Sequence, residues 1–97
     1  MQEATLLKAL AKALLASLKR DYPSVVDDLR FVLGTDKDGQ DALFVTVVLK
    51  DKPRGEYGWE DVRPVEEIIR RKVVDSDPFR FPYVGFELKS ELAHAEG

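Results

Sequence analysis

The segment 42–50, ALFVTVVLK, constrains the fold most strongly because it is apolar on both sides. Successive side chains of a β-strand point to opposite faces of a sheet. One face of this strand carries Leu43, Val45, Val47 and Leu49, and the other carries Phe44, Thr46 and Val48. Each apolar face of such a strand must be buried. If the helices of the fold cover one face, something else must cover the other.

An amphipathic helix is predicted over residues 1–20. Its leucines recur at helical spacing within about half of the circumference, and leucine and alanine both favour helix. Lys8, Lys12 and Lys19 lie along one flank. The helix should end near Tyr22, because a residue that precedes proline is disfavoured in the helical conformation. The lysines interrupt the apolar run, so we do not expect this segment to be a secretory signal.

Two further strands and a second helix follow from the same periodicities. Residues 28–33 and 83–89 alternate with period two, and residues 61–74 carry an apolar stripe at helical spacing. The segment 34–41, GTDKDGQD, collects turn-forming residues and predicts an antiparallel hairpin. Pro64 is compatible with the second helix because it is expected in the first turn.

The predicted order is therefore α-β-β-α-β, in the α+β class. We expect a two-layer α/β sandwich in which a three-stranded sheet carries two helices on one face. The 97 residues suffice for a single domain over 1–97, and no repeat or linker divides them. Residues 93–97 are expected to form a disordered tail.

Composition narrows the classes of chemistry that the chain can perform. The sequence has no cysteine, which excludes disulfides, thiolate catalysis and zinc ribbons and makes the cytoplasm the default compartment. No apolar run approaches the roughly 20 residues that cross a bilayer, so no membrane association is expected. The carboxylates of residues 36–41 lack the spacing of a calcium loop. We find no catalytic or phosphate-binding motif, and therefore expect neither an enzyme nor a cofactor or metal.

The uncovered side of the sheet is the strongest functional indication. If both helices cover the face that bears Leu29 and Val45, no element remains for Val32, Phe44 and Val48 on the opposite face. Each such side chain gains about 1.5 to 3 kcal/mol when it is fully buried, which predicts a surface for a partner or for self-association. The alternatives are that the sheet twists or that the aromatic loop near residue 80 folds beneath it.

That aromatic loop supplies a second candidate surface. Phe79, Arg80 and Phe81 either plug the end of the sandwich or form the kind of aromatic and arginine surface that anchors protein interfaces. The function predicted is a small non-enzymatic protein–protein interaction module, such as an adaptor, an immunity or antitoxin-like protein, or the small subunit of a complex. We also predict a homodimer that pairs through the second sheet face or through the edge of the second strand.

Binding of nucleic acid is the alternative function. Its candidate residues are basic and aromatic: Lys8, Lys12, Lys19, Lys52, Arg54, Tyr57 and Trp59. Aromatic rings among cations can stack on unpaired bases. A hinge loop that Trp59 anchors to the core explains the same residues. Residues 1–20 carry a charge of +3 and the remaining residues −6, and an acidic body disfavours a polyanion.

A family resemblance supports this alternative. The order of elements is similar to that of type II KH-like domains, and the ending FPYVGFELKSEL resembles the close of the ribosome-binding factor A family. The resemblance covers the topology and the last strand, and it implies an RNA-associated or ribosome-associated factor. The glycine-rich GxxG clamp of KH domains has no counterpart near residues 61–74.

Overall fold

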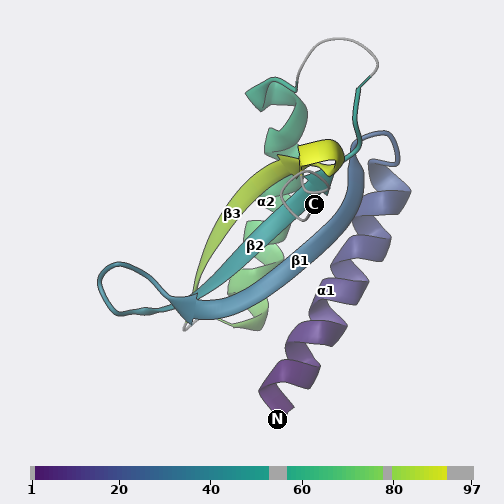
Figure 1. The fold of residues 1–97 in the computed structure, drawn as a ribbon. Coiled ribbons are helices and arrows are strands. Elements are labelled where there is room, and N and C mark those ends of the chain that lie inside the picture. The colour runs from purple at the N-terminus through teal and green to yellow at the C-terminus, as the bar shows by residue number, and fades with distance from the viewer. Residues whose placement is uncertain (1, 53–56, 78–79, 92–97) are drawn as a thin grey trace.

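The computed structural model describes residues 2–52, 57–77 and 80–91 (Figure 1). Its elements are α1 (Gln2–Asp21), β1 (Val26–Thr35), β2 (Asp41–Leu49), α2 (Trp59–Ser76) and β3 (Phe81–Leu88). The α-β-β-α-β order and the α+β class predicted from the sequence are therefore confirmed. The predicted tail, residues 93–97, lies outside the described residues.

The sheet is mixed, with the strand order β1-β2-β3. The hairpin of β1 and β2 is antiparallel, as predicted, whereas β3 returns through α2 and pairs parallel to β2. Because β2 is central, both of its edges are occupied by neighbouring strands. The prediction that the edge of the second strand pairs with another copy is therefore wrong.

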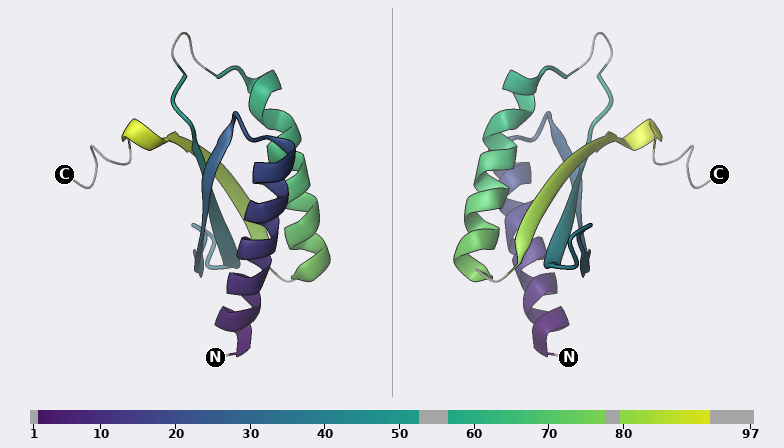
Figure 2. Two further views of the ribbon diagram at one scale, coloured as in Figure 1. Left: turned by 90° about the vertical axis from the view of Figure 1, so that its right-hand side faces the viewer. Right: turned by 90° about the vertical axis from the view of Figure 1, so that its left-hand side faces the viewer.

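Both helices lie on the same side of the sheet (Figure 2). The core between the two layers contains Leu14 and Leu18 of α1, Val45 and Val47 of β2, and Val65 and Ile69 of α2. Leu29 is also buried there, so the apolar alternation in β1 and β2 assigned the helix-facing side correctly. Among the described residues, only the short helical turn 89–91 lies on the other side of the sheet, at one end of it (Figure 2), and we refer to this side as the open face.

Strand β1 is longer at both ends than the predicted 28–33. A bulge between Val26 and Asp28 interrupts the alternation, and this irregularity hid the fully buried Val26 from a period-two pattern. At the other end, Gly34 and Thr35 still pair with β2 although their residue types are typical of turns.

Helix α2 begins at Trp59, two residues before the predicted start. The backbone N–H of Gly58 donates to Asp61 Oδ2 at 2.9 Å, which fixes the chain at the entrance to the helix. The sequence predicted Pro64 in the first turn of the helix. Because the helix starts earlier, Pro64 lies inside it instead. Proline cannot donate to the carbonyl of Glu60, so the second turn lacks one backbone hydrogen bond.

Candidate functional site

The register of the three strands orders the open face into four rows. These are Asp28, Val48 and Glu87; Arg30, Thr46 and Gly85; Val32, Phe44 and Tyr83; and Gly34, Ala42 and Phe81. The first row is charged at its two outer strands, whereas the last two rows contain only apolar, aromatic and small residues. Within the paired strands, the open face therefore has an acidic end and an aromatic end, and the hairpin loop with Asp36 and Asp38 follows the aromatic end.

Four exposed apolar residues gather at the aromatic end. Their exposed fractions are 60% for Val32, 36% for Phe44, 52% for Phe81 and 40% for Tyr83. We call these four residues the aromatic patch. Isolated exposed apolar residues are common, but contiguous ones on an uncovered sheet face mark interaction surfaces. The described part of the aromatic loop, from residue 80 on, does not fold beneath the sheet to cover them, because Phe81 and Tyr83 are themselves part of the exposed surface.

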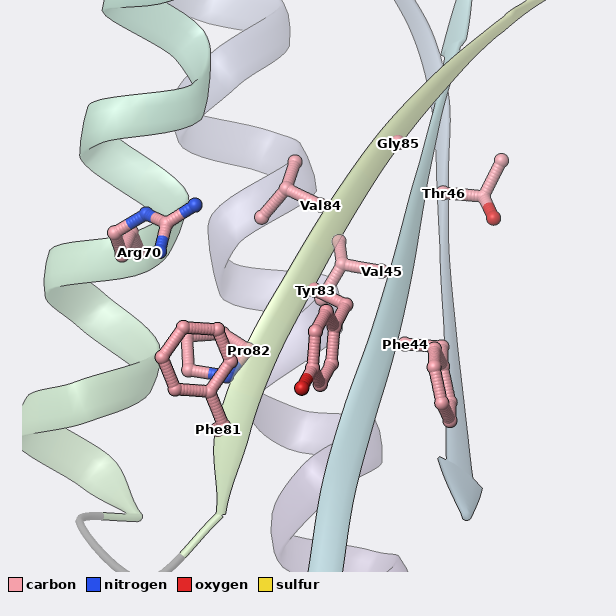
Figure 3. Close-up of a pocket in the computed structure, with 9 residues that line it drawn as sticks. All are labelled: Phe44, Val45, Thr46, Arg70, Phe81, Pro82, Tyr83, Val84 and Gly85. Atoms are coloured by element: carbon pink, nitrogen blue, oxygen red, sulfur yellow. The ribbon is translucent and has the colours of Figure 1, made fainter. Parts of the chain in front are cut away.

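The rings of the patch hold one another in place (Figure 3). Phe44 and Tyr83 stack with their centroids 5.5 Å apart and their planes 20° apart, and Phe81 lies 4.8 Å from Tyr83 in a tilted arrangement. One edge of the Phe44 ring lies over Gly34, where an added Cβ would stand 3.0 Å from Phe44 Cε2. Glycine on β1 thus allows the ring to lie across the neighbouring strand.

A hydrogen bond ties the patch to the hairpin loop. The Tyr83 hydroxyl donates to Asp36 Oδ2 at 3.0 Å, and the backbone N–H groups of Asp38 and Gln40 donate to Asp36 Oδ1. Chiefly the Gln40 amide, together with the Tyr83 hydroxyl and the Asp38 amide, lowers the pKa of Asp36 below its usual value. Hydrogen bonding to Asp36 in turn raises the pKa of Tyr83. Gly39 has a φ of 79°, as the turn-forming composition of the loop predicted.

A shallow hollow borders the patch along β3 and is lined from both sides of that edge strand. Its volume is about 420 Å³, and its lining includes Arg70 of α2 as well as Phe44, Phe81 and Tyr83 (Figure 3). The guanidinium of Arg70 lies 5.8 Å from the centre of the Phe81 ring and also pairs with Glu66. Gly85 leaves open space on the open face, since an added Cβ there would meet no atom within 4 Å.

Val48 was predicted to be exposed on this face, and that prediction is wrong. Its exposed fraction is 2%. In the register it stands between Asp28 and Glu87, and the turn after β3 lies on the open-face side of the sheet at this end (Figure 2). Lys89 from that turn forms an ion pair with Asp27 at 3.7 Å. The chain beyond β3 could not be placed from strand alternation alone.

The predicted aromatic and arginine surface is brought to the site only in part. Phe81 belongs to the patch, whereas Arg80 is largely buried and forms an ion pair with Asp77. Phe79 lies outside the described residues. Tyr83, which the sequence interpretation did not select, is central to the patch. The sequence pattern did indicate that Tyr83 faces outward, because the alternation of the last strand places Tyr83, Gly85 and Glu87 on the same side.

The candidate nucleic-acid residues fall into two groups. Lys8, Lys12 and Lys19 are exposed and lie within about 40° of one another around α1, so they form a stripe on one face of that helix. Lys52 lies 4.3 Å from the centre of the Tyr57 ring, and its Nζ is 3.5 Å from Asp61 Oδ2. Arg54 lies outside the described residues. These groups belong to the helices and the loop before α2, not to the open face.

The cluster around Lys52 has a structural role at the start of α2. Tyr57 donates a 2.6 Å hydrogen bond to the carbonyl of Lys50, and its partial burial and the charge of Asp51 raise its pKa. The Gly58 amide, followed by the Lys52 charge, lowers the pKa of Asp61. Trp59 is 57% exposed, so the expectation that it anchors this loop to the core is wrong.

Two other kinds of site were sought among the described residues. Histidine and acidic side chains form no group of three or more there that could hold a metal ion. Within the same part of the chain, neither helix has the length and apolar character needed to span a membrane.

Comparison with known proteins gives no assignment of family or function. No family model matches the chain, and neither does any curated protein or solved structure.

Proposed function

We propose that this protein is a small interaction module that binds a protein partner through the aromatic patch. The observation that carries the proposal is the contiguous exposure of Val32, Phe44, Phe81 and Tyr83 on the sheet face opposite α1 and α2. Fully burying such side chains gains about 1.5 to 3 kcal/mol each. Aromatic residues at the centre of an interface often contribute most of the binding free energy.

The geometry of the patch favours binding because its rings are ordered before a partner arrives. Phe44 is held between Gly34 and Tyr83, and the Tyr83 hydroxyl is held by Asp36. Binding immobilises exposed side chains at a cost of about 0.5 to 1.5 kcal/mol for each mobile one. Prior ordering of these rings reduces that cost.

The role that fits such a surface on so small a chain is non-enzymatic. An adaptor, an immunity or antitoxin-like protein, or the small subunit of a complex each requires a binding face and no catalytic group. The proposal includes no cofactor or metal. A cytoplasmic location agrees with the absence of cysteine.

RNA binding has less support from the same side chains. A base-binding platform presents ring faces to the bases, whereas Phe44 and Tyr83 use one face each for stacking on the other. The carboxylate of Asp36 beside Tyr83 repels phosphate, and the lysine stripe of α1 belongs to the other layer of the fold. RNA bound with the affinity of a specific complex to the open face would contradict the proposal.

A matched pair of valine variants tests the proposed surface. Val32→Ser removes an exposed valine from the patch, and Val74→Ser removes one that is 46% exposed on α2. Affinity purification with quantitative mass spectrometry should recover a partner with the wild type and Val74→Ser, and much less of it with Val32→Ser and Phe44→Ser. Circular dichroism should show that all the variants fold. Equal recovery by the wild type and both patch variants would overturn the proposal.

A further inference from the structure

We infer that the occupant of the aromatic patch is a cationic, apolar segment of a different protein, and not a second copy of this chain. The inference rests on the proposed function and adds the chemistry of the partner to it. It follows from the arrangement of charge around the patch and from the symmetry that a homodimer would impose.

Carboxylates outnumber cations around the open face. Six stand on it, in the hairpin loop or in the turn after β3: Asp27, Asp28, Asp36, Asp38, Glu87 and Glu91. The cations there are Arg30, Lys37 and Lys89, and the last is paired with Asp27. Arg80, which lines a hollow beside Asp36 and Tyr83, is paired with Asp77. A partner that meets this face finds an apolar centre between two acidic ends, and complementary potentials favour a partner with cations at its own ends.

The negative charge nearest the patch is fixed in position. Asp36 accepts hydrogen bonds from Tyr83, Asp38 and Gln40, so its carboxylate cannot turn away from the patch without losing them. These bonds also favour the ionised form and lower the pKa of Asp36. An approaching lysine or arginine can therefore meet a charge that is already oriented.

Two-fold pairing of the open face brings like charges together. Sheets that pack face to face in the aligned manner keep their strands within about 30° of one another, and the symmetry axis of a homodimer lies between them. If the axis runs along the strands, each row meets its own copy. Asp28 of one chain then faces Glu87 of the other, across β1 and β3.

The other aligned arrangement has the same defect. If the axis runs across the strands at the row of Phe44, the rows on either side exchange places. The row that contains Asp28 and Glu87 then meets the hairpin loop of the second copy, where Asp36 and Asp38 flank Lys37 and the net charge is negative. Both arrangements bury the aromatic patch only by placing carboxylates opposite carboxylates, which an interface avoids.

The hollow beside Gly85 indicates where an apolar side chain of the partner would enter. It lies next to Tyr83 and has about 420 Å³ of space, with no side chain on Gly85 to fill it. An aromatic or leucine side chain placed there would contact the ring of Tyr83 and cover the strand. The expected partner segment thus combines a large apolar residue with flanking lysine or arginine.

Selection from a random peptide library tests the chemistry of the partner directly. Peptides of about 16 residues reach about 24 Å as a helix, close to the length of the eight-residue strand β3. Phage that display them are selected on the immobilised wild type and depleted on Phe44→Ser. Enriched peptides should carry net positive charge and aromatic or leucine residues.

Charge variants then measure how the selected peptides bind. Glu87→Gln should weaken their binding about threefold, and Phe44→Ser at least about tenfold. Asp75→Asn, which removes an exposed carboxylate of α2, should change the binding little. Raising the salt concentration should weaken binding to the wild type more than to Glu87→Gln. The wild type alone should sediment as a monomer at the highest concentration that stays in solution.

The outcomes separate the inference from the proposed function. Enriched peptides that depend on Phe44 but are neutral or acidic would overturn the inference and leave the binding surface standing. A dimer that Phe44→Ser converts to a monomer would also overturn it, since the occupant would then be a second copy. Failure to enrich any peptide that depends on Phe44 would overturn both the inference and the proposed function.

Discussion

The hydroxyl of Tyr83 donates a 3.0 Å hydrogen bond to Asp36 Oδ2, and this bond joins residues 47 positions apart in the chain. Tyr83 stands on the edge strand β3, whereas Asp36 begins the loop between β1 and β2. The bond therefore crosses the end of the sheet and couples the loop to the aromatic patch. The pKa of Asp36 is lowered chiefly by the Gln40 amide, and the bond from Tyr83 and the Asp38 amide lower it further.

Replacing Tyr83 with phenylalanine should separate the hydrogen bond from the ring. Tyr83→Phe retains the stacking on Phe44 but removes the donor, so the pKa of Asp36 should rise toward the ordinary value of 3.8. The free energy of unfolding should fall only slightly, because the bond is exposed to solvent. NMR titration of the Asp36 carboxyl carbon measures the pKa. An unchanged pKa in the variant would mean that the bond does not persist in solution.

Acid should destabilise the protein partly through Asp61. The Gly58 amide and Lys52 lower its pKa in the folded state, so the folded protein binds a proton less readily than the unfolded chain, whose aspartate pKa is about 3.9. The stability that Asp61 contributes is therefore present above that value and is lost as the pH falls through the lower folded pKa. Urea unfolding midpoints should decrease below about pH 4, and less steeply in Asp61→Asn.

Asp75→Asn serves as the control for this pH dependence. Asp75 is an exposed aspartate of the same helix, and its replacement removes the same charge without touching the contact between Asp61 and the Gly58 amide. If Asp61→Asn and the wild type lose stability in parallel on acidification, Asp61 does not have the lowered pKa that its surroundings require.

Much of the fold was predictable because its elements follow simple periodicities. Strand β2 carries apolar residues on both of its faces, and the apolar residues of the two helices recur at helical spacing. The face of the sheet that packs on the helices could therefore be assigned from the sequence. The strand order and the parallel pairing of β3 could not be predicted in this way, because they depend on the three-dimensional path of the chain. The bulge after Val26 broke the alternation locally, and the inclusion of Pro64 within α2 depended on a hydrogen bond at Gly58.

The candidate site was less predictable because exposure depends on neighbours that are distant in sequence. Val32 of β1 and Phe44 of β2 were expected on the open face and are exposed there. Val48 lies on the same side of β2 as Phe44 but is buried. In the register, Val48 stands between Asp28 and Glu87, at the end of the open face where the turn after β3 lies (Figure 2). Tyr83 joins the patch for the same reason, since only the pairing of β3 with β2 places it next to Phe44.

Two glycines on the open face provide a test of how tightly Phe44 is held. An added Cβ at Gly34 would lie 3.0 Å from the Phe44 ring, whereas at Gly85 it would meet open space. Gly34→Ala should therefore shift the Phe44 ring resonances markedly, and Gly85→Ala should change stability by less than about 1 kcal/mol, in the stabilising direction. Ring resonances that respond equally weakly to both substitutions would show that Phe44 does not lie over Gly34.

A second pair of variants tests which side of α1 packs on the sheet. Leu14 is buried and the adjacent Ala13 is exposed. Leu14→Ala should cost about 2 to 5 kcal/mol of unfolding free energy, and Ala13→Ser less than about 0.5 kcal/mol. Chemical denaturation measures both. A larger loss at Ala13 than at Leu14 would require a different rotation of the helix.

The measurement that tests the binding surface most directly is NMR mapping of a bound partner segment on the wild-type chain. Titration with a peptide selected on the protein should produce its largest chemical-shift changes at Val32, Phe44 and Tyr83, with small changes at Val74. Changes that centre instead on Lys8 and Lys12 of α1, or on Trp59 at the start of α2, would contradict the assignment of the aromatic patch as the binding site.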